Sequence, residues 1–552
     1  MNISNENGLL SKCALDWGDS GAEKGEIFTK PDVVDFMLKT SGIDDNILKP
    51  ETRILEPSCG QGEFVLAIAR GLCKKVSPDD IANGKRFKFL ITAYDISSKN
   101  ISIAKSQTLQ ILNSTFSFED SSFLVEQWYR NADFLINNDN SLFTHVIGNP
   151  PYIRIENIPI ELLRKYRKIF STMKGRADLY IAFYEKSLSL LNDDGVLSFI
   201  CTDRWTKNRY GSSLRKFISQ SFQLDLFVDM YGQNAFQSEV LTYPAITQIS
   251  KRSNKQTIII HNPKINDSLS NLVTMSLRNC NVKFKGGIIR KDVVNGDKPW
   301  MFGSLDELNL INRLENEFPL IEEAGCQVFI GAATGNNKVY IINDTLDIEP
   351  CRKVPMIKAG DIKNGIDNHI QKFLINTYDE DGVIDLALFP KLQAYLESHS
   401  DILKTRYVAK NSPDAWFKTI DRVYPERASA KKLLIPDIKS ELTVVYNEGL
   451  HPNNSIYYIC SNSWNLRALQ SVLLSGLGQL FVSAYSTKVS GGNLRFQAQH
   501  LRKIRLPLWA NISKDIRLGL ENAAIEGNIE KAKNMVCALY KLTDKEKQIL
   551  GC

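Results

Sequence analysis

A short apolar strand that runs into two prolines constrains this chain more than any other stretch. Residues 144–152 read Thr-His-Val-Ile-Gly-Asn-Pro-Pro-Tyr. Proline lacks an N–H and has a fixed φ, so Pro150 and Pro151 cannot continue a sheet ladder. The chain must leave the sheet at Asn149, at the carboxyl end of a strand, where open α/β sheets bind ligands. An amide and a carbonyl here can accept both hydrogens of an exocyclic amine, and the Tyr152 ring can stack on a flat base.

A glycine-containing turn between a strand and a helix predicts a second ligand contact. In residues 53–69 an apolar strand leads into Glu56, and an apolar helix follows Gly60 and Gly62. Glycine lets a ligand approach the backbone closely, and a helix N-terminus favours a negative group. A lone Gly-x-Gly is often only a tight turn, but in this context it predicts a nucleotide-like ligand. Val65 interrupts the Gly-x-Gly-x-x-Gly fingerprint, so a dinucleotide is the poorer interpretation.

Two further acids follow predicted strands. The strand over residues 89–96 reaches Asp95, whose carboxylate can accept both hydroxyls of a ribose. Asp95 can equally cap the helix that starts near Ser97, and both roles can hold at once. Asp133 can accept from an adenine amine and Phe134 can cover its ring, although such a pair alone is usually a turn and a core residue.

The order of elements predicts the fold class and the domains. Strands alternate with helices up to about residue 250, which predicts an α/β protein with a mainly parallel, doubly wound sheet. The first helix is expected to have Thr29 as its N-cap and Pro31 in its first turn. A chain of 552 residues suggests two to four domains. The expected parts are a flexible lead-in over 1–24, a sheet domain over 25–255, a second domain over 256–510 and a helical segment over 511–552.

Composition excludes several classes of protein. Hydrophobic content of 43% and charged content of 24% are typical of a soluble globular protein. The ten cysteines form no Cys-x-x-Cys pair, which argues against a zinc site and a disulfide framework. The sequence shows no signal peptide and no uninterrupted apolar run of about 18 residues. A net charge of +6 permits nucleic acid as a partner without demanding it.

The segment 488–505 combines basic side chains with glycine and one aromatic residue. Basic side chains beside flexible backbone suit contacts with phosphate, whereas an ordinary solvated basic face explains the composition equally well. The candidate DNA-binding residues of this segment are Lys488, Arg495, Arg502, Lys503 and Arg505.

Taken together, these stretches resemble the gamma-class N6-adenine DNA methyltransferases of type II restriction–modification systems, with an Eco57I-type methylase domain and a TaqI-like C-terminal specificity domain. The family implies a Rossmann-like S-adenosylmethionine-dependent methyltransferase domain followed by a mixed α+β target-recognition domain. The motifs stand in the family's order. They are G-x-x-x-T-x-P-x-x-V-x-x-M over 25–37, L-E-P-S-C-G-Q-G-E-F over 55–64, A-Y-D-I over 93–96, A-D-F-L over 132–135 and G-N-P-P-Y over 148–152.

The resemblance implies S-adenosylmethionine as the cofactor, and no metal. Thr29 would lie near the methionine carboxylate, and residues 56–62 would form the methionine-side loop. Asp95, where relatives often carry Glu, would hold the ribose, Ile96 would pack on the adenine and Asp133 would accept from its amine. The implied cofactor-binding residues are Thr29, Glu56, Ser58, Gly60, Gly62, Asp95, Ile96, Asp133 and Phe134.

The implied substrate is a flipped adenine in double-stranded DNA. Asn149 and Pro150 would accept from N6, with Pro151 and Tyr152 completing the catalytic loop and Tyr152 stacking on the base. Phe236 falls where the family places the second stacking ring. The expected setting is a monomer in the bacterial cytoplasm, without membrane contact. A cognate endonuclease would act on the same site without needing to bind the enzyme.

Other classes of methyltransferase use the same loop. N4-cytosine, RNA and protein-glutamine methyltransferases also use Asn-Pro-Pro-Tyr, although cytosine enzymes more often carry Ser at the position of Asn149. A bifunctional restriction enzyme would need a nuclease module, of which residues 436–441 are only a faint sign. A DNA-binding protein without catalysis is disfavoured by the intact motifs.

Overall fold

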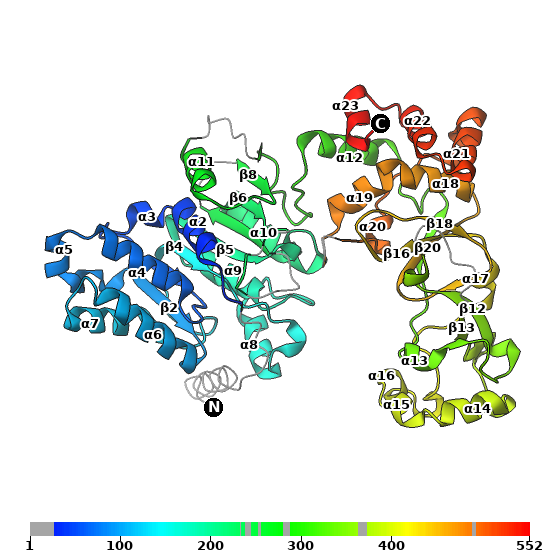
Figure 1. Ribbon diagram of the computed structural model, residues 1–552, viewed down its shortest axis with the longest axis horizontal. Coiled ribbons are helices and arrows are strands. Elements are labelled where there is room, and N and C mark those ends of the chain that lie inside the picture. Colours follow the sequence, from blue (N-terminus) through cyan, green and yellow to red (C-terminus); the bar gives the residue numbers. More distant parts are fainter. Residues whose placement is uncertain are drawn as a thin grey trace. The chain divides into compact units, whose positions relative to one another are not determined.

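The computed structural model forms two compact units, residues 1–302 (unit 1) and 303–552 (unit 2) (Figure 1). Each unit has its own hydrophobic cores. The described residues are 27–231, 233, 235–237, 244–251, 256–279, 287–362, 372–487, 489 and 493–552.

Unit 1 is built on a nine-stranded sheet in the order β3-β2-β1-β4-β5-β7-β6-β8-β9. The strands from β3 to β5 are parallel, and β7 runs antiparallel between β5 and β6. The mainly parallel sheet predicted from the sequence is therefore confirmed, and the strand order reverses direction beside β1. The strands are β1 (Ile54–Glu56), β2 (Ile91–Asp95), β3 (Tyr129–Asn131), β4 (Phe143–Gly148), β5 (Leu191–Thr202), β6 (Gln223–Asp229), β7 (Pro244–Ser250), β8 (Thr257–His261) and β9 (Ile288–Arg290).

Helices cover both faces of this sheet, because alternate strand residues point to opposite sides. Ile54 packs with the cluster that includes α2, α4, α6, α7 and α11, whereas its neighbour Leu55 packs with α8, α9 and α10. Figure 1 shows the two sets of helices around the strands. The helices are α2 (Pro31–Ser41), α3 (Ile43–Asn46), α4 (Glu63–Lys75), α5 (Pro78–Ala82), α6 (Ser98–Leu112), α7 (Phe118–Trp128), α8 (Ile160–Ile169), α9 (Tyr180–Ser189), α10 (Ser212–Ser221) and α11 (Asp267–Arg278).

The structure moves the boundary between the two halves of the chain. The charged segment 251–256 links β7 to β8, and β8 pairs in parallel with β6 of the same sheet. Ile258 and Ile260 lie in the core of unit 1, so apolar burial keeps this region in the sheet. Unit 1 accordingly extends to Phe302, and the expected boundary at residues 255 and 256 is wrong. The expected lead-in over residues 1–24 lies outside the described residues.

Unit 2 contains two four-stranded sheets, β10-β20-β16-β18 and β11-β13-β12-β19. The C-terminal helices belong to this unit, since α21 packs on α18. Its strands are β10 (Cys326–Ile330), β11 (Ile341–Asn343), β12 (Lys353–Ile357), β13 (Lys372–Ile375), β14 (Tyr378–Asp379), β15 (Gly382–Val383), β16 (Lys432–Pro436), β17 (Ile438–Lys439), β18 (Val445–Asn447), β19 (His451–Pro452), β20 (Ile456–Ser461) and β21 (Leu494–Arg495). Its helices are α12 (Leu305–Glu317), α13 (Asn337–Tyr340), α14 (Pro390–Glu397), α15 (Ser400–Lys404), α16 (Tyr407–Lys410), α17 (Pro425–Ser429), α18 (Leu466–Val472), α19 (Gly478–Tyr485), α20 (Ala498–Leu501), α21 (Lys514–Glu526), α22 (Ile529–Leu539) and α23 (Asp544–Leu550).

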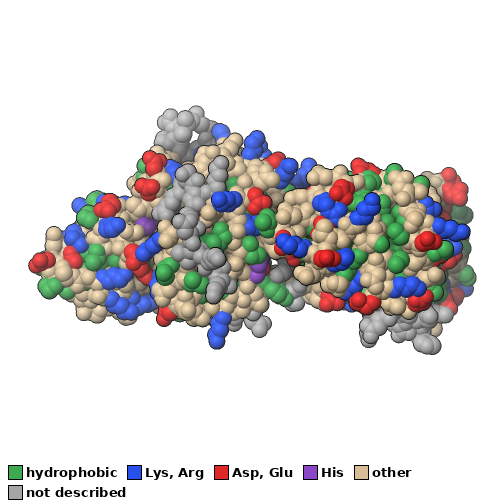
Figure 2. Space-filling model, turned by 90° about the horizontal axis from the view of Figure 1, so that it is seen from above, with side chains coloured by type: hydrophobic (Ala, Val, Ile, Leu, Met, Phe, Trp, Pro, Cys, Tyr) green, Lys and Arg blue, Asp and Glu red, His purple; other side chains and the backbone are tan. Residues whose placement is uncertain are grey.

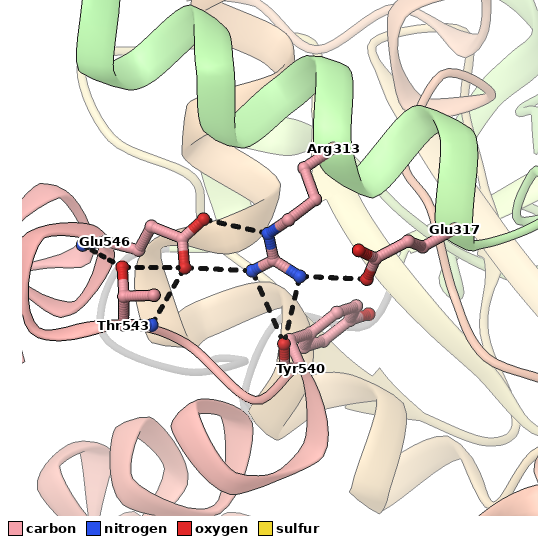
Figure 3. A network of polar contacts seen from close by, with 5 residues as sticks. All are labelled: Arg313, Glu317, Tyr540, Thr543 and Glu546. Carbon is pink, nitrogen blue, oxygen red and sulfur yellow. Dashed lines mark hydrogen bonds and ion pairs between the residues drawn. The ribbon is translucent and has the colours of Figure 1, made fainter.

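An ion pair joins the first and last helices of unit 2 (Figure 3). The Arg313 guanidinium on α12 donates to both carboxylate oxygens of Glu546 on α23, at 2.8 and 3.0 Å, and to Glu317 at 2.9 Å. Glu546 also accepts from the backbone N–H of Thr543 and closes the capping box of α23. A two-pronged contact of this kind fixes both position and direction, so it holds the C-terminal helix on the unit.

One helical stretch of unit 2, Leu466–Tyr485, has the length and hydropathy of a membrane span among the described residues. More than half of it is buried, and Leu469, Val472 and Phe481 lie in the unit's main core. This burial makes it a core helix, with a bend at Gly476, where φ is 103°.

Candidate active site

A pocket of about 930 Å³, partly open to solvent, lies at the carboxyl ends of β1, β2 and β4. This is the edge at which the sequence predicted the site. The structure brings eleven predicted residues to its wall, whereas Gly62, Tyr152 and Phe236 do not line it. The eleven are Thr29, Glu56, Ser58, Gly60, Asp95, Ile96, Asp133, Phe134, Asn149, Pro150 and Pro151.

The glycine loop after β1 is tied to the end of β2. The Gly60 N–H donates to Asp95 Oδ2 at 2.9 Å, and the Ser97 N–H donates to Asp95 Oδ1 at 2.8 Å. Asp95 therefore organises the loop while lining the pocket, and Ser97 is the N-cap of α6. Gly62, with φ of 100°, has a packing role, because a Cβ there would come within 3.1 Å of Ala104.

Glu56 is a buried acid in the pocket wall, only 1% exposed. Among the described residues its Oε2 atom has no hydrogen-bond partner. Burial, with repulsion from Glu63 and Asp95, raises the pKa of Glu56 well above its usual range. Four acids around one cavity, Glu56, Glu63, Asp95 and Asp133, favour a ligand that carries positive charge or donates hydrogen bonds.

The Asn149 side chain is held in one orientation. Its Nδ2 donates to the Ile27 carbonyl at 2.8 Å and to Thr29 Oγ1 at 3.3 Å, and Ser58 Oγ donates to its backbone carbonyl at 3.2 Å. A backbone carbonyl can only accept, so the amide nitrogen must face Ile27. The Oδ1 atom is thereby left as an acceptor for a ligand.

Thr29 differs from its predicted local role. The N-cap of α2 is Lys30, with Pro31 at the first helical position as expected, so Thr29 is not the cap. Thr29 is 2% exposed, and its hydroxyl receives the Asn149 amide instead. Thr29 thus links the segment before α2 to the loop that follows β4.

Asp133 and Phe134 are held by residues that the sequence did not reveal. Asp133 accepts from the Tyr166 hydroxyl at 2.6 Å and from the Leu135 N–H at 2.8 Å, and burial raises its pKa. Phe134 stacks on Phe183, with ring centroids 5.7 Å apart. Tyr166 and Phe183 also line the pocket, but they lie on α8 and α9 without any local motif.

The two predicted stacking rings are neighbours. The centroids of Tyr152 and Phe236 are 6.3 Å apart, with their planes at 70°. The backbones of Phe236 and Thr29 form an isolated antiparallel β-bridge, and the Gln237 N–H donates to the Phe28 carbonyl at 2.9 Å. Phe236 is only 3% exposed, so the rings cover each other in this structure. Residues 238–243, which follow Gln237, lie outside the described residues.

The basic residues of unit 2 make contacts within that unit. Arg495 forms an ion pair with Asp437, inside the stretch that faintly suggested a nuclease. Arg502 pairs with Glu322 at 2.9 Å, and Arg505 donates to the Phe318 carbonyl at 3.3 Å. Lys503 is exposed and extends over the Tyr485 ring. Lys488 lies outside the described residues, and a DNA contact by this segment stays a prediction.

Comparison with known sequences finds relatives among restriction–modification proteins. Residues 68–236 match the family model of the Eco57I restriction-modification methylase. The chain is 42% identical over 541 residues to the type II methyltransferase M.XhoI of Xanthomonas vasicola. The aligned region covers 96% of this chain and 99% of that protein. It is 41% identical over 542 residues to the type II methyltransferase M.PaeR7I of Pseudomonas aeruginosa, covering 96% of this chain and 93% of that protein.

Comparison with solved structures finds the same fold. The type IIL restriction-modification enzyme MmeI, solved in complex with DNA, matches with a TM-score of 0.63 and 12% identity. The match covers 100% of this chain and 78% of that one. The predicted methyltransferase fold is thereby confirmed, while the TaqI-like character of the second domain stays a prediction.

Proposed function

The chain belongs to the type II methyltransferases of restriction–modification systems, and from this premise we propose that it methylates N6 of adenine in double-stranded DNA, with S-adenosylmethionine as donor. The observation that carries the proposal is the fixed Asn149 amide, whose oxygen is left as an acceptor in the pocket wall. The methylation would protect host DNA from a cognate endonuclease. A monomer in the cytoplasm is sufficient for this task.

The pocket fits S-adenosylmethionine chemically, since Glu56 has a buried oxygen without a partner among the described residues and the cofactor is cationic. We assign residues 56–60 and Thr29 to its methionine end, Asp95 to its ribose, and Asp133 to its adenine amine. Ile96 and Phe134 would cover the adenine faces. When bound, the cofactor supplies a methyl group activated by an adjacent sulfonium.

The catalytic loop acts on the target amine. The N6 lone pair of adenine is delocalised into the ring, which makes N6 a poor nucleophile. The Asn149 Oδ1 and Pro150 carbonyl oxygens would accept from its two N–H groups, favour a tetrahedral nitrogen and localise that lone pair. Ile27 and Thr29 hold the amide in advance, so the stabilisation comes from preorganised acceptors and orientation.

Access to N6 requires that the base leave the duplex. Base flipping costs a few kcal/mol, and stacking on an aromatic ring returns roughly 1–3 kcal/mol per base. We assign this stacking to Tyr152, with Phe236 as the second ring. Because the two rings now meet edge to face, a base can stack on both only after the rings part.

The test is to express the chain in a host without adenine methylation and to sequence its DNA with detection of modified bases. We expect N6-methyladenine at one defined sequence in cells with the wild-type chain and none with Asn149→Ala. Methylated cytosine alone, or methylated RNA or protein with unmodified DNA, would overturn the proposal and favour the corresponding alternative.

A further inference from the structure

A second hollow, of about 940 Å³ and wide open to solvent, lies beside the first on unit 1. Three arginines line it, Arg154, Arg176 and Arg204. Over the face of the molecule drawn in Figure 2, basic and acidic side chains are interspersed. Three arginines around one hollow concentrate positive charge in this region.

The two hollows lie on either side of one backbone hydrogen bond. The Leu179 N–H donates to the Ile153 carbonyl at 3.0 Å, and both residues line the first pocket. Their sequence neighbours Arg154 and Asp178 line the second hollow. Arg154 is also two residues beyond Tyr152, so the arginines begin where the catalytic loop ends.

The segment that carries Arg204 is rigidly held. Arg204 lies in a short 3-10 turn, Asp203–Thr206, directly after β5. Arg215 is 2% exposed and donates to the carbonyls of Trp205, at 2.5 Å, and of Asn208, at 2.9 Å. Gly211 permits the close return of the chain, because a Cβ there would lie 1.9 Å from the Trp205 carbonyl oxygen. The arginine is thus presented from a fixed turn.

The charge of the hollow is positive, with three arginines against the two acids Glu156 and Asp178. Arg176 pairs with Glu156 at 2.6 Å, where both side chains are well exposed and the pair is weak. Burial raises the pKa of Asp178 to about 6, and the charges of Arg204 and Arg154 oppose that shift. Asp178 is therefore close enough to both arginines to attract their charges.

We propose that Arg154, Arg176 and Arg204 bind a backbone phosphate of the DNA strand that carries the flipped adenine. Guanidinium groups match phosphate oxygens in two-pronged contacts, and phosphate contacts set the register of a protein on DNA. The place of the hollow, next to the pocket that would receive the base, selects a phosphate adjacent to the target nucleotide. This inference rests on the proposed function.

The first test measures DNA affinity as a function of salt for the double variant Arg154→Gln/Arg204→Gln. Each lost phosphate contact should reduce the slope of log K against log salt by about 0.9, and affinity at low salt should fall about tenfold or more. Cofactor affinity and thermal unfolding should be unchanged. Arg164→Gln on α8, a 69% exposed arginine paired with Glu161, is the matched control and should leave the slope unchanged.

The second test uses a neutral methylphosphonate in place of single phosphates around the target adenine. At one position it should weaken binding by the wild type and cause no further loss in the double variant. An unchanged salt slope, or losses that add at every position, would overturn the phosphate site. A wild-type chain that methylates no adenine would instead overturn the proposed function, so the two failures are distinguishable.

Discussion

The carboxyl edge of the unit 1 sheet and the basic segment of unit 2 use polar side chains in opposite ways. At the sheet edge, Glu56, Asp95 and Asn149 come from distant parts of the chain and converge on one pocket. In unit 2, Arg495 and Arg502 form ion pairs with Asp437 and Glu322 of the same unit. Strand ends are placed by the topology of the sheet, so motifs that follow strands predict a shared site. A surface charge has many possible partners and predicts much less.

The sharpest way to break this comparison is Asn149→Ala. Loss of the preorganised acceptor should lower the rate of methyl transfer by about 10²–10³-fold or more. Cofactor affinity should stay nearly unchanged, because the Asn149 amide nitrogen is bound by Ile27 and Thr29 and its oxygen is assigned, in the proposed function, to the target base. Single-turnover transfer of labelled methyl groups and calorimetric cofactor binding measure the two quantities. Full activity in this variant would refute the assignment of the loop.

Asp95→Ala should mainly weaken cofactor binding rather than slow the methyl-transfer step. Losing hydrogen bonds to a charged acceptor costs about 1.5–3 kcal/mol, so cofactor affinity should fall about 10–100-fold. Since Asp95 also holds the Gly60 and Ser97 N–H groups, Asp95→Asn is the conservative control for loop structure. Unchanged affinity in the alanine variant would show that Asp95 only organises the loop.

The same contrast separates what the sequence predicts from what it does not. The convergence of the motifs after β1, β2 and β4 was predictable, because parallel strands end at a common edge. Tyr166 and Phe183 were not predictable, because their contacts with Asp133 and Phe134 depend on helix packing across the fold. The domain boundary failed for a related reason. The charged segment 251–256 has the composition of a linker, but strand pairing beyond it continues the sheet.

Glu56→Gln should lower cofactor affinity and raise the stability of the cofactor-free protein. Burial raises the pKa of Glu56 above its ordinary value of 4.5, so the folded protein binds that proton more tightly than the unfolded chain. The wild type therefore loses stability as the pH rises above about 4.5, and the variant does not incur this loss. We expect a thermal unfolding advantage for the cofactor-free variant that is larger at pH 8 than at pH 5.

Cofactor affinity of the same variant should fall about tenfold, because the charged acceptor is lost. Glu119→Gln on α7 is the exposed control. The hydrogen bond and ion pair with Lys85 lower the pKa of Glu119, but both side chains are exposed, so its replacement should change stability little at either pH and leave the cofactor unaffected. A Glu56→Gln variant with no pH-dependent gain would show that the carboxyl is not strained by burial.

The smallest effects are expected for the basic residues of unit 2. Those with an acidic partner should affect stability, and those without one should affect DNA binding. Lys503 is exposed and has no acidic partner among the described residues, so Lys503→Gln should reduce the salt slope of DNA binding by up to about 0.9. Arg495→Gln breaks a partly buried pair with Asp437 and should lower the unfolding temperature with little change in that slope. If Arg495→Gln instead lowers the slope and leaves stability intact, its ion pair must open to receive phosphate. The basic segment of unit 2 would then be paired with its own acids only in the absence of DNA. Its difference from the carboxyl edge of the unit 1 sheet would hold only in that state.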